Sequence, residues 1–411
     1  MFLVGCLNYL TRRTMALNLD INLYGFFYSA FSLSMLIIIY VDLGFNKSAT
    51  ILIAKYLAIN EHFKTKSIFW ALMLIKFGMG LLTAVGFFLL IDFLLNDYFH
   101  FPAGRPILRL FCLFIIISAI SGLIRATLDA YKEYVIKGYL QVGGAVIVLS
   151  GVYWGVNKYP SYAPIISYII AASVIFLLGI HYLIKNKNLR YSKTILSAMK
   201  VPIFECWQHG KWIALATAGM STMYYMDTIM LTHLSNLKSV ALYNIALPIM
   251  QIYQSLFVFH IVLTPIASEL WHKEEKEELK ALFNKINLAA IFILICGSGV
   301  IFLTPFNFHM IRILFSPDFT AANSALNILC FGMLILVVGQ LYSTTLMAIG
   351  RSQTVASINT FAALFNVIAN IFLIPRFDIS GAALATALSY LLLSCCCIWS
   401  FKKMMQESIT L

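Results

Sequence analysis

Three ionisable side chains lie inside long apolar stretches of this sequence. Lys76 follows WALMLI, Asp227 follows MSTMYYM, and His260 lies within SLFVFHIVL. An ionisable group at the centre of a bilayer costs at least ~2.5–3.5 kcal/mol, so such groups are rare unless they serve a site. Lys76 can present a cation to a phosphate or an acidic sugar. Asp227 can bind a proton or a sodium ion, and His260 is a candidate proton relay.

Each of these three residues also has a structural interpretation. The long stem of Lys76 can carry its ammonium to the lipid headgroups, and a buried histidine often only hydrogen-bonds within a bundle. Asp227 can pair with Lys76. Asp227 lies about fifteen residues into its apolar stretch, too deep to reach the headgroups easily, which favours an inward-facing role.

Amide and tyrosine side chains supply what a sugar-binding cavity needs, because amides bond hydroxyls and aromatic rings stack on sugars. The substrate-binding candidates are Lys76, Tyr224, Gln251, Gln254, Gln340, Asn366 and Asn370, and the candidates for ion binding are Asp227 and His260. The same amides are equally suited to bonding one helix to another, which is ordinary in membrane bundles.

Several kinds of chemistry are excluded by missing motifs. The sequence has no GxxxxGK[ST], HExxH or GxSxG pattern, and its eight cysteines form no CxxC pair. We therefore expect no nucleotide binding, no catalytic residue, no metal site and no cofactor other than a coupling H+ or Na+. The chain is expected not to be an enzyme. Of its 29 Lys and Arg residues, all but Lys76 lie in short loops, where they set membrane orientation rather than bind nucleic acid.

The elements that must position these residues are membrane-spanning helices. With 61% hydrophobic and 11% charged residues and a mean hydropathy of +0.86, the chain has too little polar surface for a soluble globule. Recurring apolar stretches of about twenty residues predict an all-α membrane protein. The predicted spans are residues 1–11, 25–43, 68–91, 107–125, 139–156, 164–184, 212–232, 241–264, 287–305, 325–348, 355–374 and 380–401. The first is only half the length that a bilayer requires, so this helix is expected to be truncated.

The loops between these spans differ in charge. Of the Lys and Arg residues, 20 fall in one set of alternate loops and eight in the other, with Lys76 inside a span. This asymmetry predicts a multi-pass protein with both termini in the cytoplasm. Residues 269–285 mix both charges with regularly spaced apolar residues and predict a helix lying along the cytoplasmic surface.

A weak internal repeat divides the chain in two. Leu23 and Tyr24 match Leu242 and Tyr243, and Lys158 matches Arg376, at a spacing of 218 to 219 residues. Six spans return the chain to the same side, so the halves are predicted to be parallel repeats around a central cavity. The predicted domains are an N-terminal bundle (1–190), a cytoplasmic linker (191–211) and a C-terminal bundle (212–411).

Residues 350–389 resemble the end of a polysaccharide exporter of the multidrug/oligosaccharidyl-lipid/polysaccharide (MOP) superfamily. The resemblance lies in a loop Gly-Arg, asparagines at four-residue spacing, Leu-Ile-Pro at 373–375 and the small-residue run GAALAT at 381–386. The segment VDLGFNKSATILIAK and the pair MDTIML and ALYNIA are similar to other parts of that family. Asp378 stands where the family usually has glycine.

Within that superfamily the chain is most similar to Wzx-type flippases. The resemblance implies translocation of undecaprenyl-pyrophosphate-linked oligosaccharide repeat units across a bacterial cytoplasmic (inner) membrane, for O-antigen of lipopolysaccharide or for capsule, by alternating access. The implied partners are the lipid-linked oligosaccharide, membrane lipids and other polysaccharide-assembly proteins. The alternatives are a drug or metabolite exporter of the same superfamily and, from a different class, a membrane glycosyltransferase or repeat-unit polymerase. The short loops argue against that last alternative.

Overall fold

The computed structural model describes residues 2–191, 200–256, 266–271, 273–303, 305–315 and 317–407. These residues are helical and contain no strand, which confirms the all-α prediction. The chain divides into two compact units, Met1–Ala214 (unit 1) and Leu215–Leu411 (unit 2).

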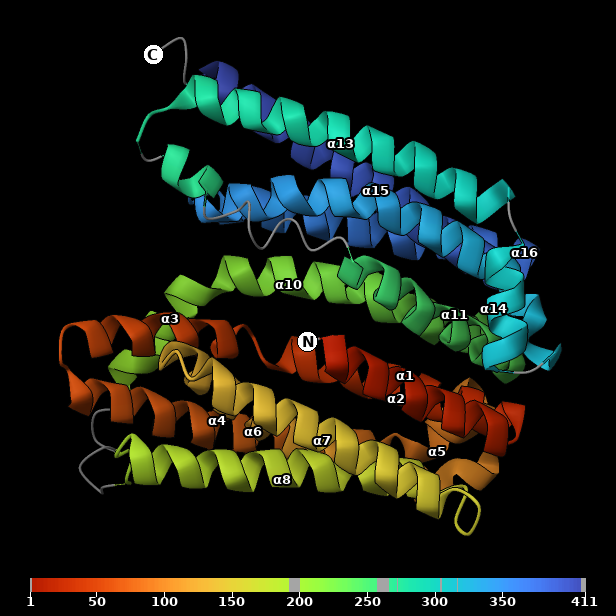
Figure 1. Cartoon of the computed structure of the whole chain (residues 1–411). Helices are drawn as coiled ribbons and strands as arrows, with labels where there is room; N and C mark the ends of the chain where they lie inside the picture. Colours follow the sequence, from red (N-terminus) through yellow and green to blue (C-terminus); the bar gives the residue numbers. More distant parts are fainter. Residues whose placement is uncertain are drawn as a thin grey trace. The chain divides into compact units, whose positions relative to one another are not determined.

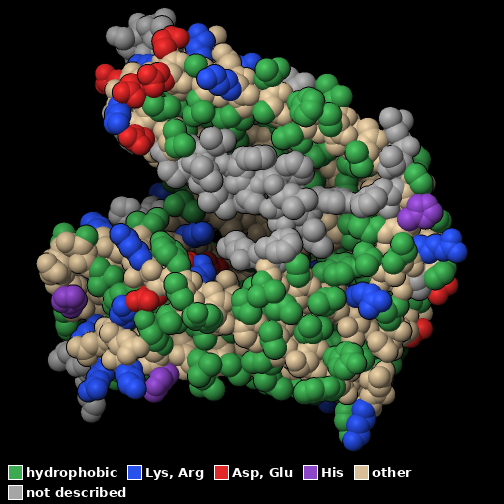
Figure 2. All heavy atoms as spheres, in the orientation of Figure 1, with side chains coloured by type: hydrophobic (Ala, Val, Ile, Leu, Met, Phe, Trp, Pro, Cys, Tyr) green, Lys and Arg blue, Asp and Glu red, His purple; other side chains and the backbone are tan. Residues whose placement is uncertain are grey.

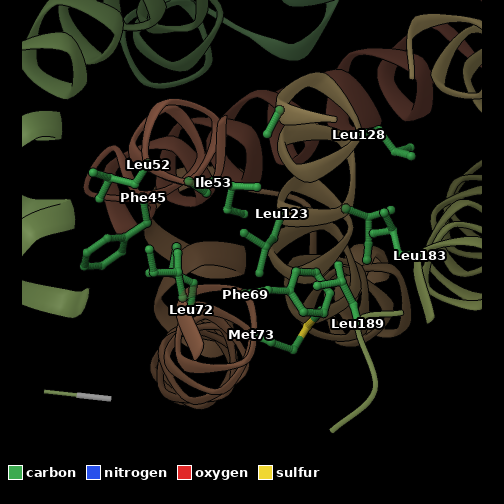
Figure 3. Packing of buried hydrophobic residues seen from close by; sticks show 14 of the residues in the cluster. Phe45, Leu52, Ile53, Phe69, Leu72, Met73, Leu123, Leu128, Leu183 and Leu189 are labelled. Carbon is green, nitrogen blue, oxygen red and sulfur yellow. The ribbon is translucent and has the colours of Figure 1, made fainter. Parts of the chain in front are cut away.

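Unit 1 is built around α6, which contacts α2, α3, α4, α7 and α8 (Figure 1). Its helices are α1 (Phe2–Asn18), α2 (Ile21–Val41), α3 (Phe45–Ala58), α4 (His62–Leu89), α5 (Ile91–Phe93), η1 (Leu94–Tyr98), η2 (Pro102–Gly104), α6 (Arg105–Ala130), α7 (Tyr134–Gly155) and α8 (Ala163–Asn186). Leu123 of α6 packs at one end with Phe45, Leu52 and Phe69 in a buried apolar cluster (Figure 3). The contacts of α6 with so many helices make it the axis of the unit.

The first helix extends further than its sequence predicts. The predicted span ends at residue 11, whereas α1 continues through Arg12 and Arg13 to Asn18 and is 17 residues long. At 1.5 Å per residue this helix rises about 26 Å. That is closer to the thickness of a hydrocarbon core, about 30 Å, than the predicted span would be. The two arginines do not end the helix, since arginine is a good helix former, and the Arg12 guanidinium lies over the Tyr28 ring, 4.5 Å from its centre.

Helix α10 (Lys200–Leu234) begins in unit 1 and continues into unit 2 from Leu215. The other described helices of unit 2 are α11 (Leu237–Leu256), α13 (Lys276–Leu303), α14 (Phe306–Leu314), η3 (Pro317–Ala322), α15 (Asn323–Ala348) and α16 (Ser352–Glu407). Of these, α15 packs most extensively against α16. The predicted spans 355–374 and 380–401 are the two arms of α16, which meet at Asp378.

Asp378 adopts a backbone conformation that glycine adopts easily. Its φ is 49° and its ψ is −128°, inside an otherwise helical segment. The Asp378 carboxylate accepts hydrogen bonds from the hydroxyls of Ser235 at 2.6 Å and Ser239 at 2.7 Å. These two bonds tie the break in α16 to the turn between α10 and α11, and they offset the backbone cost of a non-glycine residue there.

The predicted surface helix over residues 269–285 is wrong in its second half. Residues 266–271 are helical, but the chain then turns at Glu274 and α13 runs without interruption from Lys276 to Leu303. Leu279 and Phe283 are buried in unit 2, where they pack against protein rather than face the membrane surface. The amphipathic pattern therefore belongs to the first turns of a spanning helix.

The surface agrees with a membrane environment. Eight helical segments of the described chain are long and apolar enough to cross a bilayer, and one of them, Ser352–Gln406, has 55 residues, enough for two crossings. Figure 2 shows apolar side chains over the flanks of unit 1, with Lys and Arg side chains gathered towards the helix ends. The protein is a multi-pass membrane protein.

Candidate functional site

The Asp227 carboxylate is the centre of a polar cluster in unit 2. Asp227 lies on α10 and is 1% exposed. Its Oδ1 accepts hydrogen bonds from Asn370 Nδ2 at 2.8 Å and Asn366 Nδ2 at 3.3 Å. Its Oδ2 accepts hydrogen bonds from the hydroxyls of Tyr243 and Thr386. The structure thus brings together the predicted site residues Asp227, Asn366 and Asn370. It adds two hydroxyls that were not predicted, those of Tyr243 on α11 and Thr386 on the second arm of α16.

Helix geometry explains why the two asparagines reach one carboxylate. Asn366 and Asn370 are one helical turn apart on the first arm of α16, so they share a face. The break at Asp378 returns the chain, and Thr386 on the second arm then donates to the same carboxylate. Asn366 Nδ2 also lies 3.1 Å from the Thr386 hydroxyl, which joins the two arms directly.

The cluster around Asp227 supplies neutral donors and no counter-ion. No Lys or Arg of the described residues lies within ion-pair distance of Asp227. The Asn370 Oδ1 atom is buried and accepts no hydrogen bond in this part of the chain. Burying a carboxylate without a counter-ion costs folding free energy. The Asn370 amide oxygen beside it can accept a hydrogen bond or coordinate a small cation.

The remaining predicted residues of unit 2 do not join this cluster. Tyr224, on α10, is half-buried and its ring packs against Tyr225 at 5.0 Å. Gln251 on α11 and Gln340 on α15 are half-buried as well. The side chain of Gln254 and the whole of His260 lie outside the described residues, so the predictions for them stay predictions.

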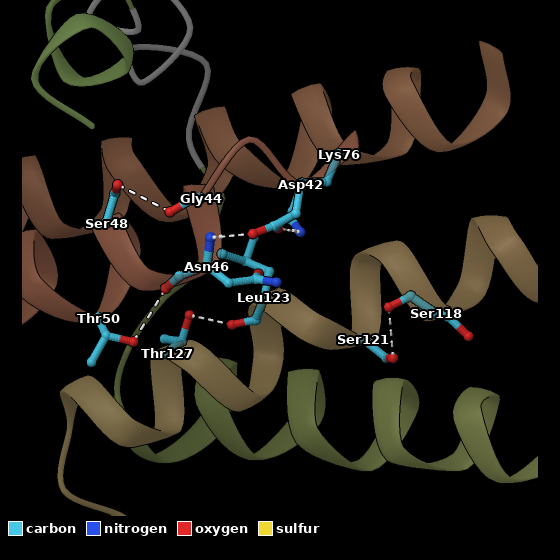
Figure 4. A network of polar contacts seen from close by, with 10 residues as sticks. All are labelled: Asp42, Gly44, Asn46, Ser48, Thr50, Lys76, Ser118, Ser121, Leu123 and Thr127. Carbon is cyan, nitrogen blue, oxygen red and sulfur yellow. Dashed lines mark hydrogen bonds and ion pairs between the residues drawn. The ribbon is translucent and has the colours of Figure 1, made fainter. Parts of the chain in front are cut away.

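In unit 1, Lys76 forms an ion pair with Asp42 (Figure 4). Lys76 lies in the middle of α4 and is 4% exposed, and Asp42 caps the C-terminus of α2. Asp42 also accepts a longer hydrogen bond of 3.4 Å from the backbone N–H of Asn46. The charge of Lys76 is therefore neutralised within its own unit. Its predicted role of presenting a cation to a substrate stays a prediction.

Unit 1 contains a cavity of about 480 Å³ between α1, α2, α6, α7 and α8. Apolar side chains form most of its wall. The polar groups in its lining are Asn8, Ser118, Ser121, Arg125, Gln141 and Tyr168. A mainly apolar cavity with a few polar groups is the usual form of a small-molecule site.

Arg125 is the only charged side chain among the described residues that line this cavity. It lies within α6, one turn before Asp129, which attracts it electrostatically. Asp129 is already bonded by the Lys137 ammonium, at 2.7 Å to each carboxylate oxygen. Arg125 makes no ion pair in the described part of unit 1. Its guanidinium is therefore available to an anion.

The sequence prediction placed Arg125 at the end of a span and counted it among the loop cations. The helix in fact continues to Ala130. The signal that could have shown the helix to continue past Arg125 is the sequence ATLDA that follows, which has no Gly or Pro to end a helix. Tyr168 was not predicted as a site residue from the sequence either. Its ring packs 5.1 Å from that of Phe31 and forms part of an aromatic wall.

Comparison with known structures defines the class of protein. A multidrug transporter of the MATE family, in an inward-facing conformation, superposes with a TM-score of 0.77 over 98% of this chain and 95% of that chain at 12% identity. A lipid II flippase, MurJ, superposes with a TM-score of 0.75 over 98% of this chain and 86% of that chain at 15% identity. The protein therefore has the fold of the MOP-superfamily transporters.

The sequence comparisons define the family. The model of the family described as polysaccharide biosynthesis protein matches residues 2–271, and the MatE model matches residues 213–372. The chain belongs to the polysaccharide biosynthesis protein family. The MatE match and the shared fold support its place in the MOP superfamily.

Three curated relatives are similar to this chain. An uncharacterized membrane protein of Methanocaldococcus jannaschii is 27% identical over 99% of this chain and 82% of its own length. A probable low-salt glycan biosynthesis flippase of Haloferax volcanii is 25% identical over 48% of this chain and 42% of its own. A capsular polysaccharide biosynthesis protein of Staphylococcus aureus is 30% identical over 31% of this chain and 32% of its own.

Proposed function

We propose that this protein moves lipid-linked oligosaccharide repeat units, carried on undecaprenyl pyrophosphate, from the cytoplasmic to the outer leaflet of the cytoplasmic membrane. The observation that carries this proposal is the cavity in unit 1, with the unpaired Arg125 in a mainly apolar wall. Family membership and the names of two relatives, a glycan flippase and a capsular polysaccharide protein, support it. The product would serve surface polysaccharide assembly, including O-antigen or capsule, alongside other assembly proteins.

The lining of the cavity matches the parts of such a substrate. Arg125 can form paired hydrogen bonds with a pyrophosphate, and a guanidinium is the side chain best suited to that geometry. Gln141 and the serines can bond sugar hydroxyls, while Tyr168 offers a ring for stacking. A single cation in an apolar wall would hold an anion in place without binding it so tightly that it could not leave.

We further propose that Asp227 couples transport to a proton or a sodium ion. The carboxylate has four neutral donors and no counter-ion among the described residues, so binding a positive charge would stabilise unit 2 in a closed packing. Releasing that charge would favour a different packing. A ligand that prefers one packing shifts the balance between conformations, which is what alternating access requires.

Deletion and complementation test the flippase proposal. Deleting the gene is expected to make lipid-linked oligosaccharide accumulate on the cytoplasmic leaflet and to remove surface polysaccharide. Complementation with Arg125→Gln is expected to restore less than about a tenth of the polysaccharide, because a lost charge-assisted hydrogen bond costs ~1.5–3 kcal/mol. Arg109→Gln is the matched control, since Arg109 is an exposed arginine on the same helix.

Two results would contradict the proposal. One is a deletion that leaves surface polysaccharide unchanged with no accumulation. The other is an Arg125→Gln variant that is present in the membrane at normal abundance and complements as well as Arg109→Gln.

Export of a small drug or metabolite is a second candidate, favoured by the MatE match over residues 213–372. A cationic drug would meet the positive charge of Arg125 in the cavity of unit 1, which disfavours it. The two candidates are separated by drug susceptibility. Increased sensitivity of the deletion strain to cationic drugs, with normal polysaccharide, would support export of drugs.

A further inference from the structure

A second pocket, of about 250 Å³, lies within unit 2 at the ends of α13, α15 and α16. Its wall contains three buried rings, those of Phe283, Tyr342 and Phe401, with ring centres 4.4 to 5.3 Å apart. The Tyr342 hydroxyl donates to Asn287 Oδ1 at 2.6 Å, so the amide group of Asn287 is held in the pocket. This volume would hold roughly eight water molecules or one small polar headgroup.

The rim of this pocket is basic. Lys280 on α13 and Lys402 on α16 both line it, and both are exposed. No carboxylate in the described residues lies within ion-pair distance of either lysine. Exposed Asn284 and Gln406 complete the polar part of the lining. Two ammonium groups and the amides give an anion several donors over an apolar, aromatic wall.

The pocket lies at the depth of the lipid headgroups. Trp399, on α16 one turn before the pocket-lining residues, is 64% exposed, and the Lys403 ammonium lies 5.4 Å from the centre of its ring. Tryptophan and lysine together at a helix end are typical of the membrane interface. By the charge of its loops, this side of the membrane is the one that the sequence predicts to be cytoplasmic, where anionic lipids attract basic residues.

An exposed apolar stripe continues from the rim along α13. Lys280, Asn284, Leu288, Phe292 and Ile295 follow one another at spacings of three or four residues and therefore share a face of the helix. The last three are 72%, 68% and 66% exposed. From Asn284 to Ile295 the helix rises about 16 Å, which is close to one leaflet of a hydrocarbon core of about 30 Å.

We propose that this pocket, defined by Lys280, Lys402 and the aromatic wall, binds the phosphate headgroup of an anionic phospholipid of the basic leaflet. The acyl chain lies along the stripe of Leu288, Phe292 and Ile295. A polar, cationic pocket joined to a leaflet-long apolar stripe fits an amphiphile, whereas a free phosphate or an acidic protein segment would use the rim alone. This site is separate from the cavity of unit 1 and does not depend on what the transporter carries.

The test uses the purified full chain in detergent, titrated with phosphatidylglycerol and with phosphatidylcholine, with bound lipid counted by native mass spectrometry. The double variant Lys280→Ala/Lys402→Ala is expected to weaken phosphatidylglycerol binding by at least about tenfold, because each substitution removes a charge-assisted hydrogen bond to the headgroup phosphate. The control is Lys285→Ala/Lys403→Ala, which removes two exposed lysines from the same two helices but outside the pocket. This control is expected to lose less than about threefold.

Three outcomes would overturn the proposal. The first is equal loss in both double variants, which would mean that general surface charge attracts the lipid. The second is binding of soluble glycerol phosphate as tight as that of the lipid, which would mean that the stripe holds no chain. The third is binding of a soluble acidic peptide in place of phosphatidylglycerol, with the same dependence on Lys280 and Lys402, which would identify a protein partner.

Discussion

At the scale of single residues, the two units use ionisable groups in opposite ways. Unit 1 pairs Lys76 with Asp42 and leaves Arg125 as the charge in its cavity. Unit 2 encloses Asp227 among neutral donors. An ion pair neutralises both partners where they lie, whereas an enclosed carboxylate without a counter-ion responds to any cation that reaches it. The two arrangements therefore suit anion binding in one unit and cation binding in the other.

Replacing Asp227 by asparagine removes the negative charge but keeps the shape of the side chain, so it tests whether the charge itself is needed. The new amide oxygen can still accept from Asn366 and Asn370, and the new amide nitrogen can donate to the Tyr243 and Thr386 oxygens, so folding is expected to survive. Membrane abundance should stay within about twofold of wild type, and transport should fall at least about tenfold and lose its dependence on the ion gradient. Transport is measured in proteoliposomes with and without a gradient. Loss of abundance instead would show that the carboxylate is structural.

A second residue-scale prediction concerns Glu133, which precedes α7 and bonds the Lys187 ammonium at the end of α8. The hydrogen bond from Lys187 lowers the pKa of Glu133. A carboxyl whose folded pKa is lowered stabilises the fold at pH values above its unfolded pKa, about 4.3, and loses that contribution as the pH falls through the folded pKa.

Glu133→Gln is accordingly expected to lower the thermal midpoint by about 1–2 °C at pH 7, since the pair is partly exposed and ion pairs of this kind contribute little. The midpoints of variant and wild type should approach each other as the pH falls below the unfolded pKa of about 4.3. Thermal unfolding of the purified protein between pH 3.5 and 8 measures this. A difference that persists unchanged at the lowest pH would mean that charge is not its cause.

At the scale of elements, close helix packing determines where unit 2 can tolerate side chains. Gly332 of α15 faces Ala387 on the second arm of α16, and a Cβ placed on Gly332 would lie 2.8 Å from the Ala387 Cα. Gly339 faces Ser394 on the same arm just as closely. These glycines allow α15 to approach the arm that carries Thr386, so the packing of two helices holds one hydroxyl of the Asp227 cluster in place.

Gly332→Val should therefore destabilise the protein. Forcing a branched side chain into this contact is expected to cost roughly 1–3 kcal/mol, or about 3–10 °C in thermal midpoint. Gly78→Val is the matched control, because a Cβ on Gly78 of α4 meets no atom within 4 Å. Both midpoints are read from thermal unfolding in detergent. An equal effect of the two variants would show that the close contact is not what matters.

At the scale of the whole molecule, charge distribution predicts the orientation of every helix. In a cysteine-free background, Lys158→Cys and Lys185→Cys place single thiols at opposite ends of α8. A membrane-impermeant maleimide added to intact cells is expected to label position 158 and not position 185, because the basic side stays in the cytoplasm. Labelling of position 185 alone would reverse the orientation, and with it the leaflet that we assign to the lipid pocket.

Much of this molecule followed from its sequence. Apolar length and composition determined that it is an all-helical membrane protein, because only segments that satisfy their own backbone hydrogen bonds can lie in lipid. The four-residue spacing of Asn366 and Asn370 determined that they share a helix face. The resemblance implied a glycine at position 378, and the positive φ found there is one that glycine adopts easily.

Only the tertiary structure decided which groups meet. It paired Lys76 with Asp42, placed Arg125 in a cavity and assembled four donors around Asp227 from α11 and the two arms of α16. It also made residues 276–285 part of a spanning helix. The physical reason is that lipid and protein interior are about equally apolar, so hydropathy shows which segments leave water but not which face of a helix turns towards another helix. The site depends on those faces, and they are decided by packing.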